Sequence, residues 1–412
     1  MNGSTFPYET KALGRMWGYV LDVPGSSGER RQRRRRGFAT KREAAEALRA
    51  AEEQLRVGVV IDDRITFGDY VEDTWLPSIA PRRGGGRSRG SVEPSTFRTY
   101  TVTVQSYLLP RLGGLRLVDL RAAHINALYD ELEATGGRSG HGLAPKTMQN
   151  IHGVLSKILG DATQQGVISR SPVDLVNAPT ADKPTHTIWT PEQLRTFLLH
   201  VADDDLHAGW MLFATTGARR GEVAGLTWDD LDLDGHELHI DWTLGHVGHD
   251  LRWKPRPKSQ AGRRTIALDP ATVDALQTHR RAQLEQRLAA GEAWGETFTD
   301  SAGLARTGLL WTYGDGSPVH PKTWYERFLR LSADAGLPRI RLHDLRHTYA
   351  TAVLEAATGW HDVKVLSQRL GHKRVGTTLD TYASVLPAVD HAKARSYAKV
   401  ILGGPGLQRD LP

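Results

Sequence analysis

Six polar residues in the C-terminal half of the chain carry side chains suited to phosphate chemistry. They are Arg219, Lys258, His343, Arg346, His372 and Tyr382, in the segments TTGARRGE, KPRPKSQAGRRTIAL, HDLRHT and LGHKRVGTTLDTY. The planar fork of an arginine gives bidentate contacts to phosphate oxygens and stays charged at any relevant pH. A phenol has an ordinary pKa of about 10, so a tyrosine needs a cationic environment and a proton acceptor before its oxygen attacks phosphorus.

The spacing within these segments is consistent with one shared site. His343 and Arg346 form an HxxR pattern, and His372 precedes Tyr382 by ten residues, a distance that a turn and the start of a helix can close. Glu222 follows Arg219 by about one helical turn, so its carboxylate can reach back and orient the guanidinium group. Each residue alone has an ordinary structural interpretation, and only their joint occurrence in this order indicates a site.

Together and in this order, the four segments resemble the catalytic set of the tyrosine recombinase family, the phage-integrase type. The resemblance covers the module from about residue 185 to the C-terminus, whereas the two preceding modules resemble the family's arm-binding and core-binding domains in layout only. It implies a site-specific DNA recombinase, an integrase that integrates or excises a phage or another mobile element.

The resemblance also implies how the scissile phosphate is bound. Arg219 and Arg346 would clamp it from two directions, and His372 would donate a hydrogen bond to a phosphate oxygen. Arg220 follows Arg219 where many relatives have an apolar residue, but the TGxRxGE spacing selects Arg219 as the arginine of the site.

The same resemblance assigns the nucleophile and the proton transfers. Tyr382 would be the nucleophile, with His343 as the candidate acceptor of its proton. The departing 5′ hydroxyl needs a proton donor, and Lys258 corresponds to the lysine that has this role in the family. Lys254 is the competing assignment, although the PKS segment just before RRTIAL favours Lys258.

A covalent 3′-phosphotyrosyl intermediate follows from these roles, and no nucleotide or metal cofactor is implied. The expected partners are double-stranded DNA with attachment-type core and arm sites, three further copies of the chain in a homo-tetramer on DNA and, by analogy, an excisionase and a DNA-bending protein. The segment DHAKARSYAKVILG, after Tyr382, would either dock between protomers or pack as an ordinary terminal helix.

Two alternatives from other functional classes compete with this interpretation. One is a catalytically silent DNA-binding regulator with a recombinase fold, which the presence of the full residue set disfavours. The other is a zinc hydrolase, because His343 and His347 stand at positions i and i+4 of an expected helix. Against zinc, Arg346 would put a cation beside the metal, and no third ligand has a suitable spacing.

The distribution of charge points to nucleic acid as the partner. The chain has a net charge of +6, yet the segment from Glu29 to Arg42 alone holds eight basic residues and one acidic residue. Such a local surplus is typical of a surface that meets a polyanion. The candidate DNA contacts are Arg30, Arg31, Arg33, Arg34, Arg35, Arg36, Lys41 and Arg42, with Arg82, Arg83, Arg87 and Arg89 in a Gly-rich linker.

The sequence predicts a multidomain protein that is mainly α with small antiparallel β-sheets (α+β). Residues 1–62 are expected to form a small β-sheet plus helix, with strands over 16–22 and 30–38 and a capping box at Thr40 and Glu43; an unstructured arginine-rich arm is the alternative. Residues 63–180 show four helical segments, as in a SAM-like core-type DNA-binding domain, and residues 185–412 form a catalytic recombinase domain with a C-terminal tail. ELHIDWTL and RRTIALD are its strand candidates.

Composition excludes several other classes of protein. The 412 residues include no cysteine, which rules out disulfide frameworks, thiolate metal sites and thiol nucleophiles. The first residues lack the pattern of a signal peptide, and no segment has the ~18 continuous apolar residues of a membrane helix. We therefore expect a cytoplasmic protein with no membrane partner.

Overall fold

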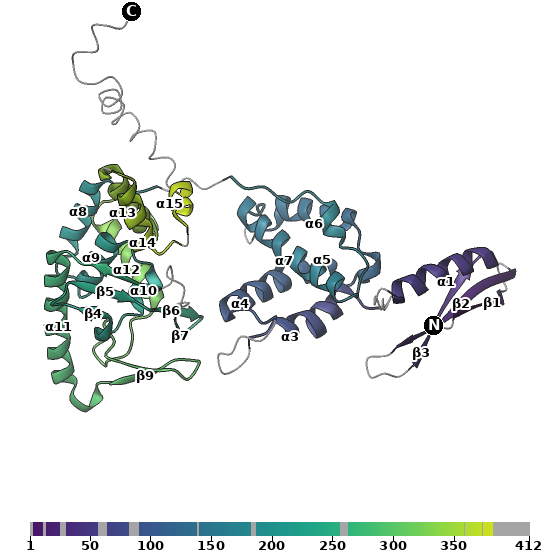
Figure 1. Cartoon of the computed structure of the whole chain (residues 1–412), viewed down its shortest axis with the longest axis horizontal. Coiled ribbons are helices and arrows are strands. Elements are labelled where there is room, and N and C mark those ends of the chain that lie inside the picture. The colour runs from purple at the N-terminus through teal and green to yellow at the C-terminus, as the bar shows by residue number, and fades with distance from the viewer. Residues whose placement is uncertain are drawn as a thin grey trace, which may run out of the picture. The chain divides into compact units, whose positions relative to one another are not determined.

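The computed structural model describes residues 3–10, 14–24, 30–56, 64–81, 90–137, 140–182, 187–255, 263–357, 359–372 and 374–381. The chain divides into two compact units, Met1–Lys183 and Pro184–Pro412, each of which is considered by itself (Figure 1). Helices predominate and the strands form small antiparallel sheets, so the expected α+β class is confirmed. Among the described helices, none has the length and apolar character needed to span a membrane.

The first unit opens with a three-stranded antiparallel sheet and one helix that covers a face of it (Figure 1). These elements are β1 (Gly3–Thr10), β2 (Gly14–Pro24), β3 (Arg30–Phe38) and α1 (Lys41–Arg56). Tyr19 and Leu21 of β2 are buried together with Leu48 of α1. Because side chains alternate along a strand, Arg34 and Arg36, which pair with Val20 and Gly18, point to the face away from α1.

The expected strands over 16–22 and 30–38 are present, and the alternative of an unstructured arm is wrong for the described part of this segment. The expected capping of α1 is also present in modified form. The Thr40 hydroxyl accepts a hydrogen bond from the Glu43 amide at 3.2 Å, but the Glu43 carboxylate accepts from the amide of Ala39 instead of Thr40. β1 was not expected, and it forms because its eight residues pair along the free edge of β2.

The rest of the first unit is helical, in four runs that match the four expected segments. Its elements are α2 (Phe67–Asp69), η1 (Tyr70–Trp75), α3 (Leu76–Ile79), α4 (Pro94–Thr103), η2 (Val104–Leu108), α5 (Leu109–Leu112), η3 (Leu117–Asp119), α6 (Ala122–Thr135), α7 (Pro145–Gln164) and η4 (Pro172–Leu175). Trp75 is fully buried among these helices, and its indole nitrogen donates a hydrogen bond to Asp161 of α7 at 2.8 Å.

Two of the four helical runs contain a π-helical turn that ends two residues before a proline. η1 precedes Pro77, and η2 precedes Pro110. A proline inside a helix has no N–H to donate, and its ring clashes with the carbonyl group four residues earlier. The wider π turn accommodates each proline, so the helical run continues past it.

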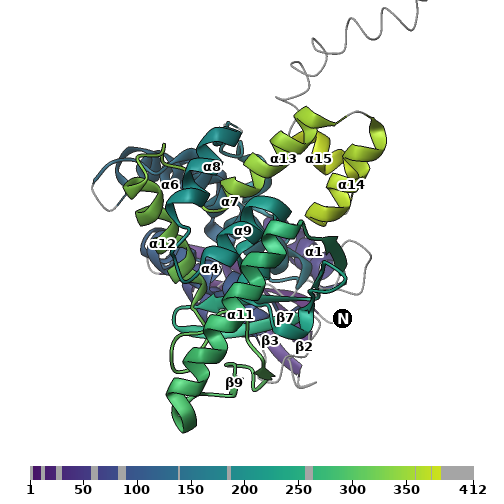
Figure 2. The same ribbon diagram turned by 90° about the vertical axis from the view of Figure 1, so that its left-hand side faces the viewer.

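The second unit packs eight helices around small sheets in its described part. The helices are α8 (Pro191–His200), α9 (His207–Thr216), α10 (Arg220–Ala224), α11 (Pro270–Ala290), α12 (Pro321–Asp334), α13 (Asp344–Ala356), α14 (Trp360–Leu370) and α15 (Val375–Thr381), with short 3-10 turns η5 (Trp228–Asp230) and η6 (Gly291–Ala293). An aromatic core holds them, in which the rings of Trp210 and Trp324 meet edge to face with centroids 5.1 Å apart. α13, α14 and α15 lie together at one side of the unit (Figure 2).

In the described part of the second unit, the strands form three small sheets. They are β4 (Leu231–Asp232), β5 (Glu237–Ile240), β6 (Trp242–Val247), β7 (Asp250–Pro255), β8 (Arg264–Ala267), β9 (Thr297–Thr299) and β10 (Ala305–Thr307). ELHIDWTL does not form one strand as expected: the chain breaks at Asp241, β5 pairs with β8, and β6 pairs with β7. The two halves of this segment therefore belong to different sheets.

Candidate active site

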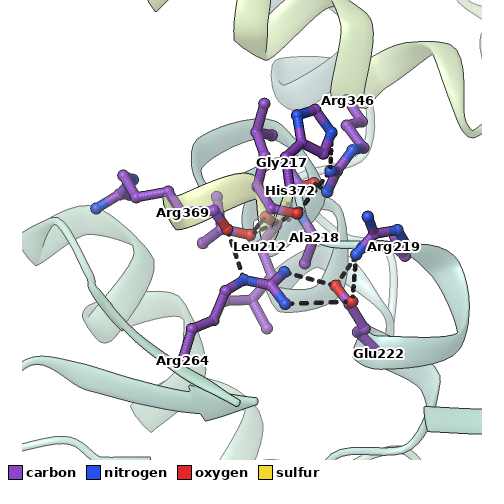
Figure 3. Close-up of polar contacts among 11 residues, drawn as sticks. Leu212, Gly217, Ala218, Arg219, Glu222, Arg264, Arg346, Arg369 and His372 are labelled. Atoms are coloured by element: carbon purple, nitrogen blue, oxygen red, sulfur yellow. Dashed lines mark hydrogen bonds and ion pairs between the residues drawn. The ribbon is translucent and has the colours of Figure 1, made fainter. Parts of the chain in front are cut away.

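Arg219 lies at the junction of two helices, α9 and α10, and the local backbone geometry fixes its position. α9 ends at Gly217, which has a left-handed backbone with φ of 62°, and Arg219 is the N-cap residue of α10. Glu222 is fully buried; it accepts from the Arg219 amide at 2.8 Å and from Nη1 of Arg219 at 2.9 Å (Figure 3). One carboxylate therefore caps the helix and holds the guanidinium group.

Arg346 is held by neutral oxygen atoms. This side chain of α13 is buried, and its Nη1 donates to the carbonyl of Gly217 at 2.8 Å. Nη2 donates to the carbonyl of Leu370 at 2.6 Å, so Arg346 contacts the C-terminal ends of both α9 and α14. The carbonyl groups at a helix C-terminus have no partner within the helix and carry partial negative charge, which makes them suitable acceptors for a cation.

His372 follows the end of α14 and faces Arg346. Its Nε2 lies 3.0 Å from Nη2 of Arg346 (Figure 3). Its Nδ1 lies 2.8 Å from the hydroxyl of Thr378 in α15. A guanidinium group only donates hydrogen bonds, so Nε2 is the acceptor and the proton of the neutral ring sits on Nδ1. Burial and the positive charges of Arg346, Arg219 and Arg264 lower the pKa of His372 to about 4, so it is neutral at pH 7.

His343 is the N-cap residue of α13, and part of its side chain is open to solvent. Loss of solvent around the rest of the ring, followed by the charges of Arg346 and Arg219, lowers the pKa of His343. A neutral imidazole at pH 7 can accept a proton. Its ring meets that of His347 edge to face, with centroids 5.5 Å apart.

Arg264 is a buried cation of this site that the sequence analysis missed. It lies in β8; its Nη2 pairs with Glu222 Oε2 at 2.7 Å, and its Nε donates to the carbonyl of Arg369 at 2.6 Å (Figure 3). Burial and the charge of Arg219 lower the pKa of Arg264 to about 9, which leaves it charged at pH 7. The available signal was its position two residues before the buried Ile266, on the same face of the strand.

The structure thus brings together Arg219, Glu222, Arg346 and His372, with His343 close enough for their charges to affect its pKa. Two of the predicted catalytic residues, Lys258 and Tyr382, lie outside the described residues. Lys254, the alternative to Lys258, lies in β7 opposite Thr243.

The predicted DNA contacts of the N-terminal module fall partly within the described residues. Arg36 lies over the ring of Tyr8 at 5.2 Å, and Arg35 lies over Phe38 at 5.9 Å on the opposite face. The remaining described side chains are exposed: those of Arg34, Lys41 and Arg42. The side chains of Arg30, Arg31 and Arg33 lie outside the described part of the structure, as do residues Arg82, Arg83, Arg87 and Arg89.

The suggested zinc site at His343 and His347 has no third ligand in the part of the chain that the structure describes. Within those residues, no group of three or more histidine, aspartate or glutamate side chains is arranged to hold a metal ion.

Comparison with known proteins identifies the family. The sequence matches the phage integrase family over residues 189–388 and an arm DNA-binding domain over residues 8–55. The chain belongs to the phage integrase family, the tyrosine recombinases. It is therefore a site-specific recombinase, an enzyme that cleaves and rejoins DNA.

Several relatives of this recombinase extend over most of the chain. A tyrosine recombinase XerC-like protein of Caldanaerobacter subterraneus subsp. tengcongensis is 25% identical over 364 residues, which cover 84% of this chain and 87% of that protein. An integrase of Streptomyces ambofaciens is 25% identical over 391 residues, or 92% of each chain. A putative prophage phiRv2 integrase of Mycobacterium tuberculosis is 27% identical and covers 76% of this chain and 73% of its own.

Solved structures share the fold. The Tn1549 transposon integrase in complex with transposon right end DNA superimposes with a TM-score of 0.60 at 21% identity, covering 74% of this chain and 96% of that one. A lambda integrase dimer bound to a core site gives a TM-score of 0.51 at 15% identity, covering 91% and 93% of the two chains.

The tight packing at Gly217 gives a first prediction. A Cβ atom there would lie 2.6 Å from the Tyr349 ring and 3.0 Å from Leu370, on a backbone with positive φ. We expect Gly217→Ala to lower the free energy of unfolding by about 2 kcal/mol, through strain and overpacking. Urea unfolding measures the loss.

Gly308 supplies the matched control, because its φ is also 62° and no atom lies within 4 Å of the position that a Cβ would take there. Gly308→Ala should therefore lower the free energy of unfolding only through the strain of a positive φ, and by a smaller amount than Gly217→Ala. Equal losses in the two variants would contradict a contribution from the contacts with Tyr349 and Leu370.

The lowered pKa of His372 gives a second prediction. In the unfolded chain this histidine takes up a proton near its ordinary pKa of 6.5, whereas in the folded chain it stays neutral down to about 4. Its contribution to stability is therefore present above pH 6.5 and is lost as the pH falls toward 4. NMR titration of labelled histidines should show one resonance that titrates near pH 4 and is missing in His372→Gln. A titration of that resonance near 6.5 would contradict the assigned environment.

Proposed function

We propose that this recombinase is the integrase of a phage or another mobile element, and that it cleaves DNA through a covalent 3′-phosphotyrosyl intermediate at Tyr382. The observation that carries the proposal is the convergence of Arg219 and Arg346 with His372. These groups come from three separate parts of the second unit, α10, α13 and the end of α14.

The charge of the site suits a phosphodiester. Arg219, Arg264 and Arg346 carry three positive charges, Glu222 carries one negative charge, and His372 is neutral at pH 7. These five groups together carry two net positive charges, which suits a phosphate and the negative charge that develops on its oxygen atoms during cleavage. Arg219 and Arg346 are the proposed clamp. His372 joins them in its other neutral tautomer, in which Nε2 carries the proton and donates to the phosphate while Nδ1 accepts a hydrogen bond from the Thr378 hydroxyl.

The proposed nucleophile follows α15 directly, because that helix ends at Thr381. The contact between His372 and Thr378 supports a position of α15 beside the clamp. In the proposed step, the Tyr382 oxygen bonds to phosphorus and its proton passes to His343, while the bond from phosphorus to the 5′ oxygen breaks. Lys258, or alternatively Lys254, gives the leaving oxygen a proton.

The N-terminal sheet is the proposed arm-site DNA contact. Its face away from α1 carries Arg34 and Arg36, and the aromatic rings of Phe6 and Tyr8 lie beside Arg36. A sheet with such a basic face can enter the major groove of DNA and contact phosphates and base edges. The other basic residues of β3 and its flanks, together with the Gly-rich linker before Gly90, belong to the same proposal.

The remaining parts of the proposal concern assembly and layout. We propose an arm-binding domain over 1–62, a core-binding domain over 63–180 and a catalytic domain over 185–412. A tetramer on DNA is supported by the lambda integrase tetramer bound to a Holliday junction, which shares the fold. We also propose an excisionase and a DNA-bending protein as partners, and a cytoplasmic location.

Trapping on DNA tests the catalytic proposal. On a suicide substrate, from which the cleaved 5′ end diffuses away, the wild-type chain should accumulate a covalent protein-DNA adduct that denaturing gels detect. Tyr382→Phe lacks the attacking oxygen and should form no adduct. Equal adduct yields from the two proteins would refute Tyr382 as the nucleophile, and no adduct from either would support the DNA-binding regulator instead.

A salt titration tests the arm proposal. Replacing Arg36 by Gln should reduce the slope of log affinity against log salt for arm-site DNA by about 0.9, because one phosphate contact is lost. Arg49→Gln is the control, since Arg49 is an exposed arginine on α1, the helix that covers the other face. The same slope for both variants and the wild type would count against contact between Arg36 and phosphate.

A further inference from the structure

We propose that Arg264 is a positioning residue that fixes the two halves of the active site relative to each other. One half is Arg219, which Arg264 reaches through Glu222, and the other is the end of α14, which leads to His372. The inference rests on the proposed function, because it takes Arg219 and the segment after α14 to act on one phosphate.

Arg264 and Arg219 share the carboxylate of Glu222. Arg264 donates from Nη2 to Glu222 Oε2 at 2.7 Å and from Nη1 to Oε1 at 3.3 Å, while Arg219 donates to both of the same oxygen atoms. Glu222 is fully buried and the Arg264 side chain is only 5% exposed. With Arg264 on one side, the carboxylate has a fixed position from which to hold Arg219.

Arg264 also contacts the end of α14. Nε of Arg264 donates to the carbonyl of Arg369 at 2.6 Å, and Arg346 donates to the next carbonyl, that of Leu370. His372 follows two residues later. The direction of the chain as it leaves α14 is therefore set by two guanidinium groups, one from β8 and one from α13.

The hydrophobic packing at this point is small, which makes the polar contacts more important. α14 packs on α13 through a cluster of its own, whose buried members are Ala350, Leu354, Leu366 and Leu370. The side chain of Arg369 adds bonds to the carbonyls of Thr215 and Ala267, at the end of α9 and in β8. Loss of Arg264 would loosen this attachment at the residue nearest the site.

The geometry requires an arginine and not only a positive charge. Arg264 uses three different nitrogen atoms to reach a carboxylate and a carbonyl, which belong to separate elements of the fold. A lysine presents its three donors at a single atom and cannot span both acceptors in the same way. Without Arg264, Glu222 would also neutralise more of the charge that Arg219 offers to the phosphate.

Full-length Arg264→Lys and Arg264→Gln test the proposal, with Arg263→Gln as the matched control. Arg263 is the preceding residue, and its half-exposed side chain pairs with Asp241 at the longer distance of 3.7 Å. On saturating suicide substrate, both Arg264 variants should form the adduct ~10–100-fold more slowly than wild type, as is usual when a group that orients a site residue is lost. DNA affinity should stay within about twofold, and Arg263→Gln should behave as wild type.

A second substrate separates positioning from general damage to the fold. A methylphosphonate at the scissile position has no negative charge on its non-bridging atoms and depends less on the arginine clamp. The defect of Arg264→Gln should therefore shrink at least about threefold on this substrate. An equal loss on both substrates, or an Arg264→Lys variant as fast as wild type, would overturn the proposal.

If the Arg264 variants do not fold, Glu222→Gln provides the test instead. It weakens the contact between Arg264 and Glu222 by changing the carboxylate. It should show the same substrate-dependent loss, and in the double variant with Arg264→Gln the two losses should not multiply. Multiplying losses would overturn the inference. Adduct formation by the wild type is a separate result, so failure of the proposed function is recognised independently.

Discussion

The site depends on the placement of several positive charges close together without cancelling them. Glu222 is the one carboxylate that pairs with Arg219 and Arg264 in the described contacts, and it is shared between them. Arg346 is held instead by the carbonyls of Gly217 and Leu370, which are dipoles without net charge. A neutral acceptor positions a cation without cancelling its charge, whereas a carboxylate positions a cation and also neutralises part of its charge.

The same concentration of charge determines the state of the histidines. Burial and the neighbouring arginines lower the pKa of both His343 and His372. Both rings are therefore neutral at pH 7, when one can accept a proton and the other accepts a hydrogen bond from Arg346. The arginines that make the site suitable for phosphate therefore also keep its two imidazole rings neutral.

The fold supplies the carbonyl groups that hold these cations. α9 and α14 both end at left-handed glycines, Gly217 and Gly371, and their last carbonyls point toward the arginines of β8 and α13. The aromatic core around Trp210 holds α9 rigidly, whereas α14 is attached by a smaller cluster and by guanidinium contacts. Elements with few buried apolar contacts open most readily, so the polar contacts carry much of the position of α14.

The sequence by itself determined those features of the protein that depend on residues close together along the chain. Helical periodicity located the four helical segments before residue 180. The one-turn spacing of Arg219 and Glu222 predicted their contact, because three residues along a helix bring two side chains together. Residue types and their order also identified the family. Lys258 and Tyr382 stay predictions of this kind.

Only the tertiary structure decided the contacts between distant residues. Arg264 and Glu222 are 42 positions apart, and the division of ELHIDWTL between two sheets depends on which strands lie beside it. β1 is a strand because β2 offers it an edge. Such pairings follow from the packing of the whole unit, and a local pattern of residues carries no information about which distant partner will be there.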